Sequence, residues 1–402
     1  MCRGTELSSI LSLTPTPPAN AFLRREDLEG SEPRFPLELL FCAECNFVQL
    51  ADVVSPELLF NDYVYVSSTS PVFVAHFEEV AETFDRRFDF PRGSLVVDIG
   101  SNDGILLRPF AERGWRVLGI DPAREIAARA TSAGTETIPA FFSRDLAHAL
   151  LAERGSAKLI TATSVFPHVH DLDDLVAGVA TLLAEDGVFV IEAYYLGAML
   201  RDNLFDTIYH EHLSYFTLRS LVRLFERLGM SVFDVEEIET HGGSLRVYIS
   251  PSGRQAVNDV AIRRVLEEED ARALGDRVTY EQFAERIEGN KRALQELLRS
   301  LKASGKRLAG YGAPAKGNTL LHHFGIGVDT LDYIVDDSPW KQGRYTPGTH
   351  IPVVSADALH SEPPDYLLIL AWNFAEPIMA KLADFKTHGG QFIVPVPEPA
   401  VL

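Results

Sequence analysis

Runs of apolar and polar residues divide the chain into three stretches with different predicted structure. Residues 1–67 hold short apolar runs between proline-rich segments such as "TPTPPAN", a pattern typical of loops. Residues 68–303 alternate continuous apolar runs with segments of helical periodicity, and they close with a charged helical stretch that we expect to be a connecting layer. Residues 304–402 repeat the alternation on a smaller scale. The pattern predicts an α/β protein with a loop-rich N-terminal domain, a Rossmann-like middle domain and a smaller Rossmann-like C-terminal domain.

The first predicted strand of the middle domain ends in a glycine-bearing turn of a kind that binds nucleotides. The run "VVDIGSNDG" places Asp98, Gly100, Asn102 and Gly104 in this turn, and the next strand ends in Asp121. Glycines let the backbone approach a ligand, and an acid about twenty residues later takes ribose hydroxyls. The pattern differs from G-x-G-x-x-G, so it favours the S-adenosylmethionine (SAM) turn of class I methyltransferases over a turn that cradles a diphosphate. A structural glycine turn in another Rossmann-like domain is the alternative.

Four polar or ionisable residues, "YHEH", stand side by side in the apolar and aromatic stretch "NLFDTIYHEHLSYF". On a helix His210 and His212 would diverge by about 200°, and the HExxH spacing of zinc proteases is absent. On an extended segment the two rings would share a face, with Glu211 opposite. A histidine beside a glutamate suits a general base, so we interpret the cluster as a proton-transfer site. Metal binding and a structural hydrogen-bonded cluster are the alternatives.

All three cysteines fall in the N-terminal stretch, at Cys2 and at Cys42 and Cys45 of "FCAEC". A C-x-x-C pair puts two thiolates on one tight turn, which suits tetrahedral zinc. A zinc ribbon needs a second such pair, and a cysteine three residues before Cys2, upstream of the recorded Met1, would supply it. The alternative is a free buried cysteine and a chance pair.

The C-terminal domain contains a second glycine-bearing turn, in "GYGAPAKGN". It runs from Tyr311 to the start of a predicted helix near Lys316 and Asn318. Helix N-termini after such turns bind phosphate, and Lys316 adds a positive charge. A purely structural Rossmann-like domain is the competing interpretation.

Composition narrows the classes of function. The 402 residues are 46% hydrophobic and 23% charged, as in ordinary globular proteins with sizeable cores. The formal net charge of −20 argues against a general nucleic-acid or anionic-membrane surface. No apolar run approaches the roughly 18–20 residues that cross a bilayer. The N-terminus lacks the basic and apolar regions of a signal peptide, so we expect a cytoplasmic protein.

Six stretches, in order over nearly the whole chain, resemble the nucleotide-deoxysugar C-methyltransferase family, whose members add branch methyl groups to TDP-4-keto sugars of antibiotic glycosides. The stretches are "PRFPLELLFCAEC", "DYVYVSSTS", "VVDIGSNDG", "DTIYHEHLSYFTL", "HGGSLR" and "GYGAPAKGNTLL". The resemblance implies a zinc-binding domain over residues 1–67 and a class I SAM methyltransferase domain over residues 68–303. It also implies a Rossmann-like nucleotide-sugar domain over residues 304–402, with the active site between the domains.

The resemblance also implies roles for single residues. His212 would be the base that removes a proton from carbon 3 of the sugar, and Glu211 and Tyr209 would bind or polarise the sugar. Tyr63 would reach the same pocket, and His168 would contact an oxyanion or a hydroxyl. One departure bears on His168: its loop reads "SVFPH", where the family pattern resembles "NVFAH".

The remaining implied roles concern the two substrates and the metal. In the SAM site the turn residues would frame the cofactor and Asp121 would take the ribose; in the nucleotide-sugar site five residues would contact the substrate, namely His241, Arg246, Tyr311, Lys316 and Asn318. Zinc, held by Cys2, Cys42 and Cys45, would be structural. The runner-up functions are a SAM methyltransferase acting on another nucleotide sugar, position or atom, and a nucleotide-sugar-binding scaffold without catalysis.

Overall fold

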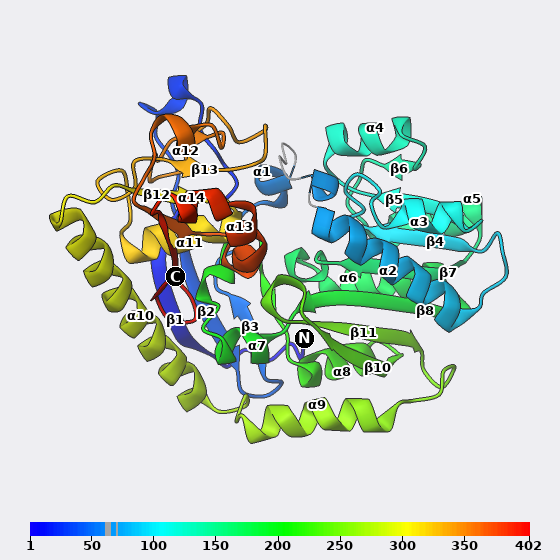
Figure 1. The fold of residues 1–402 in the computed structure, drawn as a ribbon. Coiled ribbons are helices and arrows are strands. Elements are labelled where there is room, and N and C mark those ends of the chain that lie inside the picture. Colours follow the sequence, from blue (N-terminus) through cyan, green and yellow to red (C-terminus); the bar gives the residue numbers. More distant parts are fainter. Residues whose placement is uncertain (61–65, 70) are drawn as a thin grey trace.

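The computed structural model describes residues 1–60, 66–69 and 71–402, and the strands of these residues form three sheets. Figure 1 places the seven-stranded sheet on one side of the molecule and the four-stranded and six-stranded sheets next to each other on the opposite side. The predicted α/β class is confirmed, and both Rossmann-like sheets are present.

The four-stranded sheet is antiparallel and joins segments that are far apart in sequence. Its strands, in spatial order, are β1 (Leu7–Thr16), β2 (Phe35–Cys42), β3 (Phe47–Leu50) and β9 (Ser214–Tyr215). Val48 of β3 pairs with Tyr215 of β9. The segment that carries "YHEH" therefore runs directly into the N-terminal sheet, a pairing that the sequence pattern did not predict. Short helices complete this part of the chain: η1 (Arg25–Asp27), α1 (Pro56–Phe60) and η2 (Ser67–Thr69).

The seven-stranded sheet has the order β10-β11-β8-β7-β4-β5-β6. Its strands are β4 (Leu95–Ile99), β5 (Arg116–Ile120), β6 (Thr137–Ile138), β7 (Ala157–Thr163), β8 (Leu183–Tyr194), β10 (Met230–Ile238) and β11 (Ser244–Pro251). The strands from β8 to β6 are parallel, whereas β10 and β11 pair antiparallel. Every residue of β4 is buried, because a parallel strand with helices on both faces has no solvent-exposed side.

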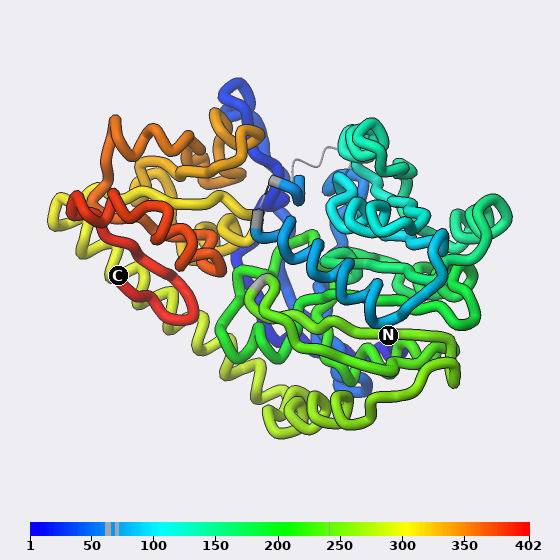
Figure 2. Tube along the Cα trace, turned by 45° about the vertical axis from the view of Figure 1, so that its right-hand side comes forward, coloured from blue at the N-terminus to red at the C-terminus, as the bar shows by residue number. Residues whose placement is uncertain are grey.

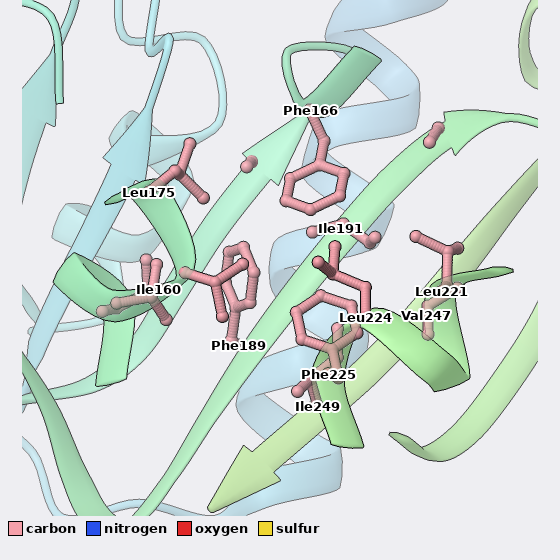
Figure 3. Packing of buried hydrophobic residues seen from close by; sticks show 14 of the residues in the cluster. Ile160, Phe166, Leu175, Phe189, Ile191, Leu221, Leu224, Phe225, Val247 and Ile249 are labelled. Carbon is pink, nitrogen blue, oxygen red and sulfur yellow. The ribbon is translucent and has the colours of Figure 1, made fainter. Parts of the chain in front are cut away.

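Helices cover both faces of this sheet. They are α2 (Pro71–Phe88), α3 (Leu107–Glu112), α4 (Arg124–Ser132), α5 (Arg144–Arg154), α6 (Leu172–Leu182) and α8 (Leu218–Arg227), with the short helices η3 (Phe166–His168) and η5 (Thr240–Gly242) near the strand ends. The next helices along the chain, α7 (Leu196–Arg201) and η4 (Phe205–Thr207), pack instead into the core of the two smaller sheets. Alternate residues of a strand point to opposite faces, so Ile160 and Phe189 pack with Phe225 of α8 while Leu159 packs with Phe110 of α3. Figure 3 shows the first of these two cores, in which the rings of Phe189 and Phe225 lie 6.2 Å apart.

The six-stranded sheet has the order β14-β13-β12-β15-β16-β17 and is parallel except at β17. Its strands are β12 (Leu308–Tyr311), β13 (Ile334–Val335), β14 (Val353–Val354), β15 (Tyr366–Ile369), β16 (Gln391–Val394) and β17 (Ala400–Val401). The helices of this part are α11 (Ala315–Phe324), α12 (Ala358–Ser361), η6 (Trp372–Phe374), α13 (Ala375–Lys381) and α14 (Ala383–Thr387).

A 27-residue helix, α10 (Arg277–Ala303), follows α9 (Asp259–Ala271) and leads from the middle sheet to the C-terminal sheet. Its buried residues Tyr280, Phe283, Ile287, Leu294 and Leu298 recur at helical spacing. They share one core with apolar residues of β1, β2, α11 and β12. In Figures 1 and 2 this helix runs along the N-terminal and C-terminal sheets. The two smaller sheets are therefore packed together through a common core. No helix among the described residues has the length and apolar character that a membrane crossing requires.

Candidate active site

A cavity of about 520 Å³ lies where the three sheets meet. The ends of β4, β5, β7 and β8 contribute to its lining, as do the "YHEH" loop and the turn before α11. It brings together eight of the residues singled out in the sequence: Asp98, Gly100, Asn102, Asp121, His168, Tyr209, His212 and Lys316. Of the others, Gly104, Glu211, Arg246, Tyr311 and Asn318 lie outside this lining.

The turn after β4 has the backbone that its glycines predict. Gly100 has φ +71, its N–H donates to the carbonyl of Ile120 at 2.7 Å, and a Cβ at this position would lie 2.1 Å from Val165. Asn102 also has a positive φ of +50, and its N–H donates to Asp121 Oδ2 at 2.8 Å. The other oxygen of Asp121 accepts the N–H of Ala123 at 2.9 Å. A carboxylate has about four lone-pair sites, so Asp121 keeps capacity for ribose hydroxyls.

Carboxylates concentrate at this end of the cavity, where Asp98, Asp121 and Glu192 all contribute to the lining. Asp98 accepts the Thr161 hydroxyl at 2.6 Å, and burial, with Asp121 and Glu192 nearby, raises its pKa to about 7. SAM carries positive charge on its sulfonium and its ammonium, so this acidic end fits the cofactor chemically. The geometry of the glycine turn and the acidic lining both agree with SAM.

Glu192 is held by two side chains, of Arg246 and His76, that the sequence did not connect to it. Arg246 Nε donates to one oxygen at 2.7 Å, and His76 Nε2 lies 3.2 Å from the other. Burial would raise the pKa of Glu192, but His76 and Arg246 outweigh burial and lower it. Arg246 also pairs with Glu236 at 3.3 Å. Arg246, expected to contact the nucleotide sugar, thus lies on β11 of the middle sheet with its charge engaged by two carboxylates.

His212 is oriented by its own loop. Its Nδ1 lies 2.6 Å from the carbonyl oxygen of Thr207. A carbonyl only accepts, so Nδ1 carries the hydrogen and Nε2 is the nitrogen that can take up a proton. The rings of Tyr209, Tyr194 and His168 lie 4.0, 4.5 and 4.9 Å from the His212 ring and fix its plane.

The rest of "YHEH" forms a buried turn between η4 and β9 rather than a helix or a strand. His210 Nε2 contacts the carbonyl of Phe35 at 3.2 Å, which ties the turn to β2. Glu211 accepts the side-chain amide of Asn20 at 2.6 Å, and Asn20 itself contributes to the cavity lining. In the described part of the chain, metal-type ligands gather at the cysteines and not at this turn.

His168 closes the short helix η3 beside His212. Burial lowers its pKa to about 4, so the ring is uncharged at neutral pH. The carbonyl of Pro167, in the loop that departs from the family pattern, accepts the N–H of Leu213 at 2.9 Å. Ser164 has φ +56 at the start of the loop. The "SVFPH" loop and the His212 loop are therefore hydrogen-bonded to each other.

The three cysteines come together at the β2–β3 turn. Their sulfur atoms all lie within 4.8 Å of one another, and Cys2 and Cys42 are 3.6 Å apart. Zinc with Zn–S bonds near 2.3 Å in a tetrahedron separates its sulfurs by about 3.8 Å. Cys2, Cys42 and Cys45 therefore fit three of the four positions around zinc.

The turn before α11 brings Lys316 to the cavity. Its Nζ donates to Asn373 Oδ1 at 2.5 Å and lies 3.6 Å from the centroid of the Trp372 ring. Burial lowers the pKa of Lys316 to about 8. The Trp372 indole N–H donates to Asp206 at 2.6 Å, and burial raises the pKa of this carboxyl to about 6.

The other two residues of this turn have partners elsewhere. The Tyr311 hydroxyl lies 3.3 Å from Asp337 and 3.1 Å from Lys381. Asn318 donates to the carbonyl of Ala19 at 2.6 Å, next to Asn20. Of the remaining expected residues, Tyr63 lies outside the described residues, and so does the side chain of His241.

Sequence reasoning missed several residues of the cavity. Glu192 interrupts the apolar run "VFVIEAYY", and a charge inside a buried strand is a signal that could have pointed to it. Lys341 stands in a polar loop and gives no such signal. His76 falls on an ordinary amphipathic helix, so only the fold brings it to Glu192.

Three family models cover most of the chain. Residues 1–60 match "Putative zinc binding domain", residues 74–235 match "Methyltransferase domain", and residues 239–397 match "C-methyltransferase C-terminal domain". These matches follow the order of the three sheets. They agree with a SAM-dependent methyltransferase that carries a zinc-binding domain at its N-terminus.

Relatives in sequence add to these matches. The chain is 39% identical, over 100% of its length and 96% of the relative, to "C-methyltransferase NovU" of Streptomyces niveus. It is 26% identical to a "Ubiquinone biosynthesis O-methyltransferase" of Cupriavidus pinatubonensis, over 44% of this chain and 75% of that one. A magnesium protoporphyrin IX methyltransferase from Synechocystis with bound SAM superposes with a TM-score of 0.34 at 14% identity, over 45% of this chain and 82% of that one. The chain belongs to the C-methyltransferase family and is a SAM-dependent methyltransferase.

Proposed function

We propose that this enzyme transfers the methyl group of SAM to carbon 3 of a TDP-4-keto-deoxysugar, the carbon next to the ketone. The observation that carries the proposal is the orientation of His212, whose Nδ1 donates to Thr207 while its ring contributes to the cavity lining. Carbon methylation needs such a base, because the carbon becomes nucleophilic only after its proton is removed. The printed name of the relative, "C-methyltransferase", supports carbon as the acceptor.

Bound SAM supplies an electrophilic methyl group. His212 Nε2 accepts the proton of carbon 3, and the electron pair of the broken C–H bond forms an enolate. The hydrogen bond from Nδ1 to Thr207 keeps the ring in this tautomer and stabilises the imidazolium that forms. His168, uncharged at neutral pH, does not repel that imidazolium although the two rings lie 4.9 Å apart.

Tyr209 and Asn20 are placed to handle the sugar. Tyr209 contributes to the cavity lining beside His212, and its hydroxyl is a donor suited to the ketone oxygen, where negative charge develops. Glu211 acts through Asn20, whose amide it holds at 2.6 Å. Asp98, Asp121 and Glu192 hold SAM at the other end. Cys2, Cys42 and Cys45 hold zinc, which fixes the turn between β2 and β3.

Solvent exchange tests the base separately from methyl transfer. A TDP-4-keto-deoxysugar incubated with the enzyme in deuterium oxide, without SAM, should gain one deuterium at carbon 3. His212→Gln should abolish this gain while SAM binding by calorimetry stays within about twofold. His148, exposed on α5, gives the matched control: His148→Gln should exchange like the unmodified enzyme.

With SAM added, mass spectrometry should show a sugar heavier by one methyl group, attached to carbon 3. Exchange at the unmodified rate in His212→Gln would remove His212 from the role of base. A product methylated on oxygen would overturn the proposed reaction itself.

A further inference from the structure

Two lysines of the C-terminal domain, Lys316 and Lys341, contribute to the lining of the active-site cavity. Lys341 lies in the loop after β13 and is 7% exposed. Its Nζ donates to the carbonyl of Ala313 at 2.8 Å. Ala313 lies in the turn before α11, and Lys316 is the second residue of that helix. Both lysines are thus anchored around the same turn.

Neither ammonium forms an ion pair with a carboxylate of the described residues. Buried charges are normally paired, because removing an ammonium from water is costly. Arg246 shows the usual solution: it is 8% exposed and meets Glu192 and Glu236 at 2.7 and 3.3 Å. Lys341 is buried to the same degree as Arg246 but has no such ion pair. This difference points to a negatively charged ligand that binds in the cavity.

The carboxylates nearest to Lys341 are engaged with other donors. Asp336 accepts the N–H of Ala313 at 2.6 Å and that of Ser338 at 2.8 Å. Glu211 accepts the amide of Asn20. An ammonium has three donors, and Ala313 takes one of those on Lys341. The ring of Phe22 lies 5.3 Å from the Nζ, and Asp336 and Glu211 interact with Lys341 only electrostatically, without an ion-pair contact.

We propose that Lys341 binds the diphosphate of the nucleotide-linked substrate together with Lys316, and so selects nucleotide-bound over free sugars. This inference rests on the proposed function. Lys341 holds the diphosphate from the β13 loop, and Lys316 holds it from the first turn of α11. The cavity then has two ends of opposite charge. Carboxylates at the β4 end take cationic SAM, and lysines at the α11 end take the anionic nucleotide.

Calorimetry with TDP, which lacks the sugar, tests the site without any chemistry. A charge-assisted hydrogen bond contributes about 1.5–3 kcal/mol, so Lys341→Gln should weaken TDP binding about 10–100-fold. Glutamine retains an N–H donor but loses the charge. Lys341→Arg should restore part of the affinity. The dissociation constant for SAM should stay unchanged in both variants, which shows that the fold is intact. Lys386, exposed in the same domain, gives the control Lys386→Gln, which should bind TDP normally.

TDP binding by Lys341→Gln at the unmodified affinity would overturn the proposal, and so would an unmodified enzyme that does not bind TDP. Steady-state kinetics separates this outcome from failure of the proposed function. Lys341→Gln should raise the KM for the nucleotide sugar with little change in kcat. A lower kcat with unchanged TDP affinity would place Lys341 at the reacting sugar instead and contradict the diphosphate assignment. A third outcome refutes only the proposed reaction. If Lys341→Gln loses TDP affinity as expected but the unmodified enzyme transfers no methyl group to the keto sugar, the lysine site stands and the reaction does not.

Discussion

Removing the guanidinium of Arg246 should destabilise the middle domain and weaken SAM binding, because Glu192 would lose its main partner. Glu192 is 2% exposed and Arg246 is 8% exposed, and their contact is 2.7 Å. Breaking a buried pair on one side costs about 3–5 kcal/mol. We expect about 3 kcal/mol for Arg246→Met, since His76 stays 3.2 Å from the other oxygen.

Thermal unfolding followed by circular dichroism measures this cost. For a domain of 150–250 residues, 1 kcal/mol lowers Tm by about 2–4 °C, so Arg246→Met should lower it by about 6–12 °C. Glu192→Gln added to this variant should recover part of the loss, because the amide removes the unpaired buried charge. Titration with SAM should show at least about tenfold weaker binding of SAM to Arg246→Met, whereas affinity for TDP should not change.

Two results would refute this reasoning. If Arg246→Met melts within about 2 °C of the unmodified enzyme, the pair does not carry the expected energy. If the variant keeps its SAM affinity and loses TDP affinity instead, Arg246 binds the nucleotide sugar, as the family resemblance implied. Its pairing with Glu192 would then not support SAM binding.

Three further predictions concern the glycine turn after β4, the cysteine cluster and Lys316. Gly100→Ala should abolish measurable SAM binding in calorimetry, because its Cβ would lie 2.1 Å from Val165 at a φ of +71; normal binding would show that the turn adapts. Cys45→Ser should lose about one equivalent of zinc by elemental analysis and melt earlier, and full zinc content would remove Cys45 from the site. Burial gives Lys316 a pKa of about 8, so this residue loses its charge as the pH rises through 8, and TDP affinity should fall between pH 7 and 9. Lys316→Arg should flatten that fall, because arginine keeps its charge over this range. The same pH dependence in Lys316→Arg would contradict the role of Lys316.

Local patterns were sufficient for many of the elements and for the backbone of the glycine turn after β4. The run from Leu95 to Ile99 is apolar apart from Asp98, which is what a parallel strand buried on both faces requires. The glycine spacing and Asp121 then follow from one strand–turn–helix unit. The cluster "YHEH" could be selected because titratable side chains in an apolar stretch need a reason to be there, and the family resemblance singled out His212 within it.

Long-range pairing was beyond such patterns. A sequence shows that Arg246 and Lys341 are cations, but only the fold pairs Arg246 with Glu192, while Lys341 donates to a backbone carbonyl and forms no ion pair with the described carboxylates. Asn318 illustrates a rule that could have been applied. Lys316 and Asn318 are two residues apart on α11, so their side chains leave the helix in directions that differ by about 200°. They therefore could not both face one ligand. Asn318 indeed contacts Ala19 instead.

The pairing of β9 with β3 has a consequence for building chimeras within this family. His212 stands two residues before β9, and β9 belongs to the sheet whose β2–β3 turn carries the cysteines. The loop that carries His212, the proposed base, is thus encoded in the middle of the chain but supported by its beginning. A methyltransferase domain expressed alone would leave β9 without its partner strand. A functional exchange of the N-terminal domain between relatives should therefore move residues 1–60 together with residues 205–216, as one inherited unit.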